Sequence, residues 1–159
     1  MVQGHFYFLK DDFFIDFPDK NIQKNHEMIN GVPHDKPCFC AIKGDKDVFW
    51  LVPISSQTAK YHSLEHKKIL KYGKCDTIKF GEVLGYEKAF LIQNMIPVTD
   101  KYIKSEYVDK NNNPVRVDGA FELVLIKTAL EVLAKQRKGV KLVFPDILVM
   151  EGILIERQQ

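Results

Sequence analysis

The chain lacks long hydrophobic runs and has no strong excess of charge of either sign. No apolar stretch approaches the ~20 residues that a transmembrane helix needs, so no membrane span is expected. The N-terminal segment MVQGHFYFLKDDFF carries acidic residues where a signal peptide would be apolar. The 23 basic and 21 acidic residues give a net charge of only +2. That balance does not by itself indicate nucleic-acid binding, although a local basic patch is compatible with it.

Cysteine is scarce, and no familiar catalytic signature occurs. The three cysteines, Cys38, Cys40 and Cys75, are an odd number, which argues against a disulfide framework and favours a reducing, cytoplasmic location. No Cys/His pair has zinc-finger spacing. There is no Gly-rich phosphate loop, Walker pattern, G-x-S-x-G elbow or HExxH motif. We therefore expect no metal and no cofactor.

What the chain does contain is enough for one domain, residues 1–159. Hydrophobic residues make up 45% of the sequence and charged residues 28%, which is typical of a globular protein with a substantial core. Aromatic-rich and alternating segments predict β-strands. These predicted strands lie near residues 4–9, 37–43, 47–54, 76–83 and 87–94.

Other segments are predicted to be less regular. Residues 18–35 have few apolar anchors and are expected to form a long connection. Residues 57–72 are polar and are predicted to be a loop with at most a short helix. Gly44, in the turn GDK of the first hairpin, is expected to supply the unusual backbone angle. Pro97 is expected to end strand pairing, and an Asn-rich turn within 102–117 predicts a hairpin or paired extended segments.

One long helix is predicted over 119–137. Asp118 is a good N-cap, and Gly139 follows the helix as its C′ residue. The apolar positions form a broad stripe with helical spacing, namely Phe121, Leu123, Val124, Leu125, Ile126, Thr128, Leu130, Val132 and Leu133. In the tail, 140–156, helix and strand compete. Strands that precede a late helix predict an α+β fold, with an antiparallel sheet or small barrel and helices on one side.

The stretch FWLVPISSQTAKYHS holds a concentration of hydroxyl groups after an apolar strand. Ser55, Ser56 and Thr58, with Lys60 nearby, could bind a phosphate through hydroxyl, amide and ammonium groups. The alternative is that these serine and threonine residues only form a turn at the end of the strand, and the residue spacing alone favours this alternative. Lys36 precedes the strand that pairs with this one, so we expect its side chain to lie close to Ser55 and Ser56.

A second group of residues is compatible with single-stranded RNA. The segment EHKKILKYGK places Lys67, Lys68 and Lys71 near Tyr61, and lysines with aromatic residues are what such binding uses. A solvated helix face is the alternative. His62 and His66 are four residues apart and could form an acid–base or metal pair, or be two solvated side chains. The isolated histidines, any of which could be an acid or base, are His5, His26 and His34.

The order and spacing of several short motifs go further than composition. The segments DKPCFCAI, VFWLVPISS followed by a lysine, AFLIQNMIPV and the long helix resemble the toxins of type III toxin–antitoxin systems. These are the ToxN and AbiQ-like endoribonucleases, and the chain looks most like their CptN branch. The resemblance covers most of the chain. It implies a compact, strongly bent, barrel-like antiparallel sheet with packed helices, similar to the MazF and Kid toxins.

The resemblance also implies an activity and a partner. The expected activity is metal-independent RNA cleavage by 2′-OH attack, which leaves a 2′,3′-cyclic phosphate and a 5′-OH. The expected partner is a repeated, pseudoknot-forming antitoxin RNA that the toxin cuts into units and that inhibits it. Several toxin copies and RNA units would then form a closed assembly, with no membrane involved.

Residue by residue, the family's basic residue at the hairpin start corresponds to Lys36, and its hydroxyl pair to Ser55 and Ser56. Its following lysine corresponds to Lys60, although here three residues intervene, so Thr58 or His62 could take part of that role. The resemblance implies that the serines orient the scissile phosphate and that the lysines stabilise its charge. The expected RNA-binding residues are Lys43, Thr58, Tyr61, His62, Lys67, Lys68 and Lys71.

Two other functions are compatible with the same residues. One is a non-catalytic RNA-binding or interaction module on a small β-barrel, in which the Ser-Ser step is only a turn. The other is a small metal-dependent hydrolase that uses His62 and His66.

Overall fold

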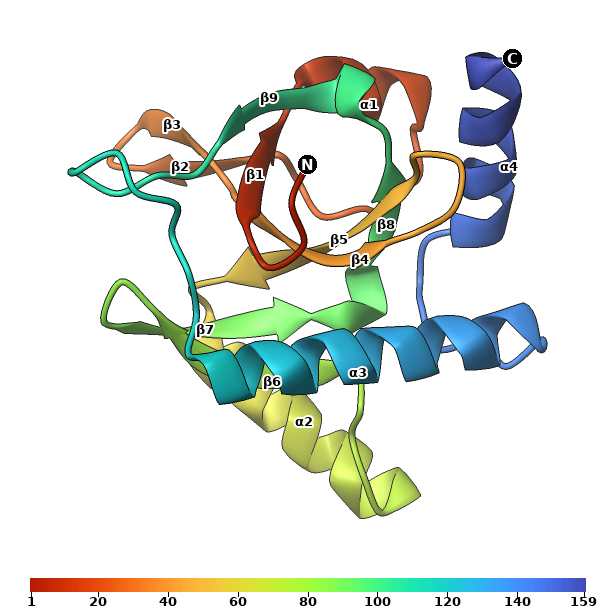
Figure 1. Ribbon diagram of the computed structural model, residues 1–159. Helices are drawn as coiled ribbons and strands as arrows, with labels where there is room; N and C mark the ends of the chain where they lie inside the picture. The colour runs from red at the N-terminus through yellow and green to blue at the C-terminus, as the bar shows by residue number, and fades with distance from the viewer.

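A seven-stranded antiparallel sheet forms the centre of the computed structural model, which describes residues 1–159 (Figure 1). The strand order is β6-β7-β5-β4-β1-β9, and β8 also pairs with β5. The strands are β1 (Phe6–Leu9), β4 (Cys38–Lys43), β5 (Phe49–Ser55), β6 (Ile78–Val83), β7 (Tyr86–Leu91), β8 (Ile96–Val98) and β9 (Ile103–Glu106). The outermost strands β6 and β9 do not pair with each other, so the sheet is bent but open. The predicted α+β fold, with an antiparallel sheet and packed helices, is confirmed, and the sheet that was expected to be barrel-like is not closed.

The helices pack against different strands of this sheet. Figure 1 shows α3 lying along the lower strands, α2 beneath β6 and β7, and α4 standing at the side of the sheet. The helices are α1 (Asp11–Asp16), α2 (Thr58–Tyr72), α3 (Gly119–Arg137) and α4 (Ile147–Gln158), with 3-10 turns η1 (Ile92–Asn94) and η2 (Asp100–Tyr102). None of them is long and apolar enough to cross a membrane.

The core forms around the two central strands. Every residue of β5 is buried, and Trp50, its second residue, is only 1% exposed. Aromatic rings from neighbouring strands pack edge to face, as Phe6 does on Phe39 with ring centroids 5.4 Å apart. The long helix α3 has the predicted bounds and caps: the Asp118 carboxylate accepts hydrogen bonds from two backbone amides, and Gly139 has a φ of +92°. Part of its predicted apolar stripe is nevertheless exposed, at Leu123, Val124 and Leu130.

The hairpin β4–β5 is confirmed, but its turn works differently from the prediction. The left-handed residues are Lys46 and Asp47, with φ of +54° and +56°. Gly44 is needed for close approach, because a Cβ there would lie 2.8 Å from the carbonyl oxygen of Val48.

Three predictions about the connections are wrong. Residues 57–72 form the 15-residue helix α2, in which Tyr61 is buried and which ends at Gly73. Within 18–35, the strands β2 (His26–Ile29) and β3 (Val32–Asp35) form a separate two-stranded hairpin. Pro97 lies inside β8 opposite Trp50; β8 has a partner on one side only, which is where a sheet tolerates proline.

The segment 102–117 is extended but pairs mainly with a distant strand. β9 pairs antiparallel with β1, and the only pairing across the Asn-rich turn is a single bridge between Val108 and Pro114. The predicted local hairpin is therefore reduced to that bridge. The expected strands near 76–83 and 87–94 are confirmed as β6 and β7.

Candidate active site

The two serines at the end of β5 have different environments. Ser55 is 7% exposed, and its Oγ accepts a hydrogen bond from the backbone N–H of Gln57 at 3.1 Å. This bond shapes the turn that leads from β5 into α2. Ser56 follows the strand and is exposed. Only Ser56 therefore presents its hydroxyl group to a ligand from outside.

A lysine from another strand reaches this exposed serine. In the β5–β7 ladder Ser55 lies opposite Ala89, so the preceding residue of β7, Lys88, comes beside Ser56. The Lys88 Nζ donates a hydrogen bond of 2.7 Å to the Ser56 Oγ. Because a hydroxyl group has one proton and two lone pairs, Ser56 keeps its own proton free to donate elsewhere. The pair thus offers a hydroxyl donor and an ammonium group side by side.

A cavity of about 330 Å³ opens in front of this pair. The β2–β3 hairpin forms one wall and the β6–β7 turn forms the other. Lys36 lies between β3 and β4 and lines the same cavity, as the sequence predicted. The residues around it are Glu27, Ile29, His34, Asp35, Lys36, Pro37, Ile54, Ser56, Val83, Leu84, Tyr86, Lys88 and Tyr107. The volume is in the range of small-ligand pockets.

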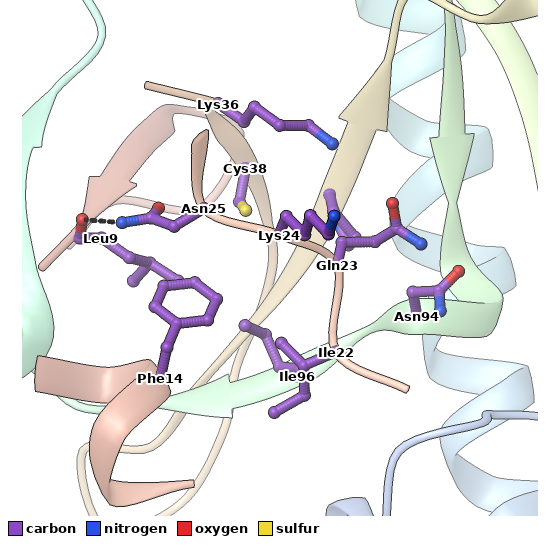
Figure 2. A pocket seen from close by; sticks show the side chains of 11 residues that line it. Leu9, Phe14, Ile22, Gln23, Lys24, Asn25, Lys36, Cys38, Asn94 and Ile96 are labelled. Atoms are coloured by element: carbon purple, nitrogen blue, oxygen red, sulfur yellow. Dashed lines mark hydrogen bonds between the residues drawn. The ribbon is translucent and has the colours of Figure 1, made fainter. Parts of the chain in front are cut away.

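Lys36 also borders a narrow crevice on its other side, which Figure 2 shows. There its side chain extends above Cys38, and its ammonium group points to the same side as the ends of Lys24 and Gln23. Burial raises the pKa of the Cys38 thiol to about 12, with the Lys36 charge acting in the opposite direction. The backbone N–H of Lys36 donates to the carbonyl oxygen of Asn25 at 3.0 Å, which fixes the base of the hairpin.

The other predicted catalytic residues lie outside the cavity. Lys60 is exposed in the first turn of α2, with its Nζ 5.3 Å from the ring centroid of Tyr61. Thr58 is half-buried at the start of the same helix. The cavity therefore brings together Lys36 and Ser56, but neither Lys60 nor Thr58 lines it.

Several residues expected to bind RNA are engaged within the protein. Tyr61 is 5% exposed, and burial raises the pKa of its hydroxyl group. His62 stacks on Phe80, with ring centroids 3.6 Å apart, and its Nε2 contacts the Glu87 carboxylate. The Lys68 Nζ donates to the hydroxyl of Thr77 at 3.0 Å and to the side-chain oxygen of Gln93 at 2.7 Å.

The remaining predicted lysines are exposed, but not all in one place. Lys67 and Lys71 lie on the outer face of α2. Lys43 ends β4, at the opposite end of that strand from Lys36. The lysines thus form a group along α2 and the cavity, with Lys43 apart from it.

The cavity-lining residues that the sequence did not single out include Glu27, Tyr86, Lys88 and Tyr107. Lys88 comes to Ser56 through a pairing between distant strands, which no local pattern announces. The wall that holds Glu27 was detectable, because the dipeptide Asn30-Gly31 between two short extended runs is a strong signal for a two-residue hairpin turn. Both turn residues are left-handed, with φ of +51° and +77°.

No group of three or more His, Cys, Asp or Glu side chains is arranged to hold a metal ion. His62 and His66, the pair considered as metal ligands, both lie on α2. His62 already contacts the Glu87 carboxylate within the protein.

Among solved structures, the fold is similar to that of an anti-phage endoribonuclease of a type III toxin–antitoxin system. That protein is the lactococcal AbiQ; the match has a TM-score of 0.69, covers 99% of each chain and has 14% sequence identity. At this identity the likeness establishes the fold. No protein-family model matches the chain. No curated protein matches it by sequence.

Proposed function

We propose that the chain is a metal-independent endoribonuclease toxin of a type III toxin–antitoxin system. The observation that carries the proposal is the full-length fold match to AbiQ, an endoribonuclease of that type, combined with a cavity that holds two lysines and a serine. A cavity with two ammonium groups and a free hydroxyl donor suits a phosphodiester, because both kinds of group stabilise negative charge on phosphate oxygens.

The proposed reaction is an attack of the RNA 2′-oxygen on the adjacent phosphorus. The O2′–P bond forms and the P–O5′ bond breaks, which leaves a 2′,3′-cyclic phosphate and a 5′-OH. Ser56 donates its hydroxyl proton to a non-bridging phosphate oxygen while Lys88 donates to its Oγ. Ser55 acts indirectly, because its hydrogen bond to Gln57 holds the turn that presents Ser56.

Lys36 and Lys88 stabilise the negative charge that accumulates on the phosphorane. This assignment replaces Lys60 by Lys88 in the role that the family resemblance implied, because Lys88 contacts Ser56 and lines the cavity. The N-terminus of α2 lies two residues beyond Ser56 and adds positive potential from its unpaired amides.

Lys60 is assigned instead to binding the RNA strand outside the cavity. Lys60, Lys67 and Lys71 are exposed and are seven and four residues apart on α2, so they share one face of the helix. We name these three residues the α2 lysine stripe. It leads away from Ser56 and suits successive phosphates of one strand. Lys68, whose ammonium group is bonded within the protein, is not part of it.

The proposed partner is a repeated, pseudoknot-forming antitoxin RNA. The chain would cut the repeats into units, bind them along the α2 lysine stripe and the cavity, and be inhibited within a closed assembly of several protein and RNA copies. The order of the sequence motifs supports a position near the CptN branch of these toxins.

The experiment that tests this function uses purified protein in EDTA with RNA that spans the repeats upstream of its gene. We expect products with 2′,3′-cyclic phosphate and 5′-OH ends. Ser56→Ala should abolish cleavage and growth arrest in cells, and Lys36→Ala should do the same. Ser63→Ala, an exposed serine of α2 outside the cavity, is the matched control and should cleave normally.

Each other result has a definite meaning. Tight RNA binding without cleavage by the wild-type protein would contradict the enzyme and support a non-catalytic RNA-binding module. Full cleavage by a Ser56→Ala/Lys36→Ala double variant would contradict the site. Cleavage that EDTA abolishes would contradict the metal-independent mechanism.

A further inference from the structure

The wall of the cavity that the β2–β3 hairpin forms carries a carboxylate and an imidazole. Glu27 on β2 and His34 on β3 are register partners in the hairpin, and both line the cavity. Directly opposed residues of an antiparallel pair project from the same face, with Cβ atoms about 4.5–5.5 Å apart. The two side chains therefore stand next to each other on the face that looks toward Ser56 and Lys88.

These two side chains are free of partners within the protein, unlike the other charged groups of the hairpin. His26 contacts Asp11 at 2.6 Å and Asp35 at 2.9 Å, and Asp35 also pairs with Lys104 at 2.6 Å. Glu27 and His34 belong to no ion pair and make no side-chain hydrogen bond. They are therefore available to a ligand in the cavity.

No other histidine is placed to act there. His5 contacts Glu106, His26 is held by two aspartates, and His62 contacts Glu87. His66 is exposed on α2 outside the cavity. His34 is the one histidine that lines it.

We propose that Glu27 is the general base and His34 the general acid of RNA cleavage at this site. The inference rests on the proposed function and identifies the two proton-transfer groups that it requires. A carboxylate is ionised and acceptor-only at neutral pH, so Glu27 can remove a proton but has none to give. An imidazole is the side chain whose charge ordinarily changes between pH 5 and 8, so it can deliver a proton.

The step balances as follows in atoms and charge. Glu27 takes the proton of the 2′-OH as O2′ bonds to phosphorus. His34 gives its proton to O5′ as the P–O5′ bond breaks, and the products are the cyclic phosphate and a 5′-OH. Protonated Glu27 and neutral His34 then exchange their protons with water, so no oxidant, reductant or co-reactant is needed.

The charges around the pair suit this division of roles. Asp35 and Lys36 follow His34 along the chain, Lys88 and Tyr86 face the pair from β7, and Tyr107 completes the rim. Lys36 and Lys88 hold the phosphate, as proposed above; Lys36 directly follows the hairpin and Lys88 lies on β7. The charge-stabilising groups and the proton-transfer groups thus line one and the same cavity.

The test is a single-turnover cleavage assay with the full-length protein across pH 3.5 to 9, a range that includes the pH at which carboxyl groups ordinarily titrate. We expect a bell-shaped rate profile for the wild type. Glu27→Gln and His34→Gln should each lower the maximal rate by about 10²- to 10⁴-fold. His34→Gln should also lose the decline at high pH, and Glu27→Gln the decline at low pH. His66→Gln is the matched control and should match the wild type, and all variants should bind 2′-O-methyl RNA equally well.

A substrate with sulfur in place of the leaving O5′ separates the acid from the base. A thiolate leaves without protonation, so His34→Gln should cleave this substrate at nearly the wild-type rate, whereas Glu27→Gln should remain slow. Wild-type protein that cleaves no RNA would overturn the proposed function and this inference together. Wild-type cleavage with both variants within threefold of His66→Gln, and with unchanged pH profiles, would overturn the acid–base pair alone.

Discussion

Lys88 and Ser56 are 32 residues apart in sequence, yet their side chains are joined by a hydrogen bond. Because Lys88 donates to one lone pair of the Ser56 oxygen, the hydroxyl proton of Ser56 remains free to donate to another group. An ammonium group beside the proposed phosphate site is worth more than one on the solvated face of a helix, since a partly enclosed cavity screens charge less than water does. The two lysines, Lys88 and Lys60, can therefore be distinguished by experiment.

We expect Lys88→Ala to lower the cleavage rate by about 10²- to 10³-fold, as the loss of one positioned transition-state donor does in other enzymes. Lys60→Ala should instead weaken RNA binding and leave the single-turnover rate at saturating protein nearly unchanged. Rates and RNA affinities of both variants, measured side by side, check this. A slow Lys60→Ala with a normal Lys88→Ala would return the catalytic role to Lys60.

At this scale the sequence predicted part of the site. The sequence predicted that Lys36 and Ser56 lie close together, because each lies at the end of a strand in one local hairpin, and the two residues do line one cavity. Lys88 was not found, because it meets Ser56 through the pairing of β5 with β7. Tyr61 and Lys68 were expected to be available to RNA but contact the protein, since a polar sequence does not tell which side of a helix is buried.

At the scale of elements, β6 and α3 meet at a glycine. A Cβ at Gly81 would overlap the ring of Phe121, and that ring packs edge to face against Phe90, with centroids 5.1 Å apart. Because Gly81 on β6 has no side chain, the first turn of α3 can approach the sheet closely. The ring cannot move aside without separating from Phe90 in the core.

Gly81→Ala should therefore destabilise the fold by about 1–3 kcal/mol, the usual cost of overpacking. The measurement is urea unfolding followed by circular dichroism. Gly152→Ala is the matched control, because no atom lies within 4 Å of a Cβ there. It should be neutral or slightly stabilising, since alanine favours a helix. Equal stability of the two variants would contradict the packing argument.

The elements that the sequence predicted well are those with strong local signals. For α3, both the N-cap at Asp118 and the C′ glycine could be recognised, so the first and last residues of the helix could be predicted. For α2, few apolar residues face the sheet, so its helical period was weak. The β2–β3 hairpin was overlooked although its Asn-Gly turn was visible. The openness of the sheet depends on whether β6 and β9 meet, which no local pattern determines.

For the whole molecule, the near-neutral net charge of +2 has to be reconciled with the proposed binding to a polyanion. Along α2, Lys60, Lys67, Lys68 and Lys71 stand against Glu65 alone, so the local excess of positive charge lies on that helix. In the cavity, Glu27 and Asp35 offset the charges of Lys36 and Lys88. Binding should therefore depend on salt through these few lysines.

We expect the logarithm of RNA affinity to fall linearly with the logarithm of salt concentration. The double variant Lys67→Ala/Lys71→Ala should make this slope shallower by about 0.7 for each phosphate of a single strand that the protein no longer neutralises. Lys43→Ala/Lys127→Ala, which removes the same charge from exposed positions outside the stripe, should leave the slope unchanged. Titrations at several salt concentrations measure it, and equal slopes for the two double variants would refute a localised RNA surface.

The β2–β3 hairpin, finally, has a consequence for how such a protein diversifies. It forms its own two-stranded sheet and shares no ladder with the seven-stranded one, while Met28, Ile29 and Val32 remain exposed on it. Substitutions at these three exposed positions leave the buried strands β4 and β5 and the proposed pair Glu27 and His34 untouched. New preferences can thus be acquired there at low cost in foldability, and a laboratory library confined to these positions would sample them.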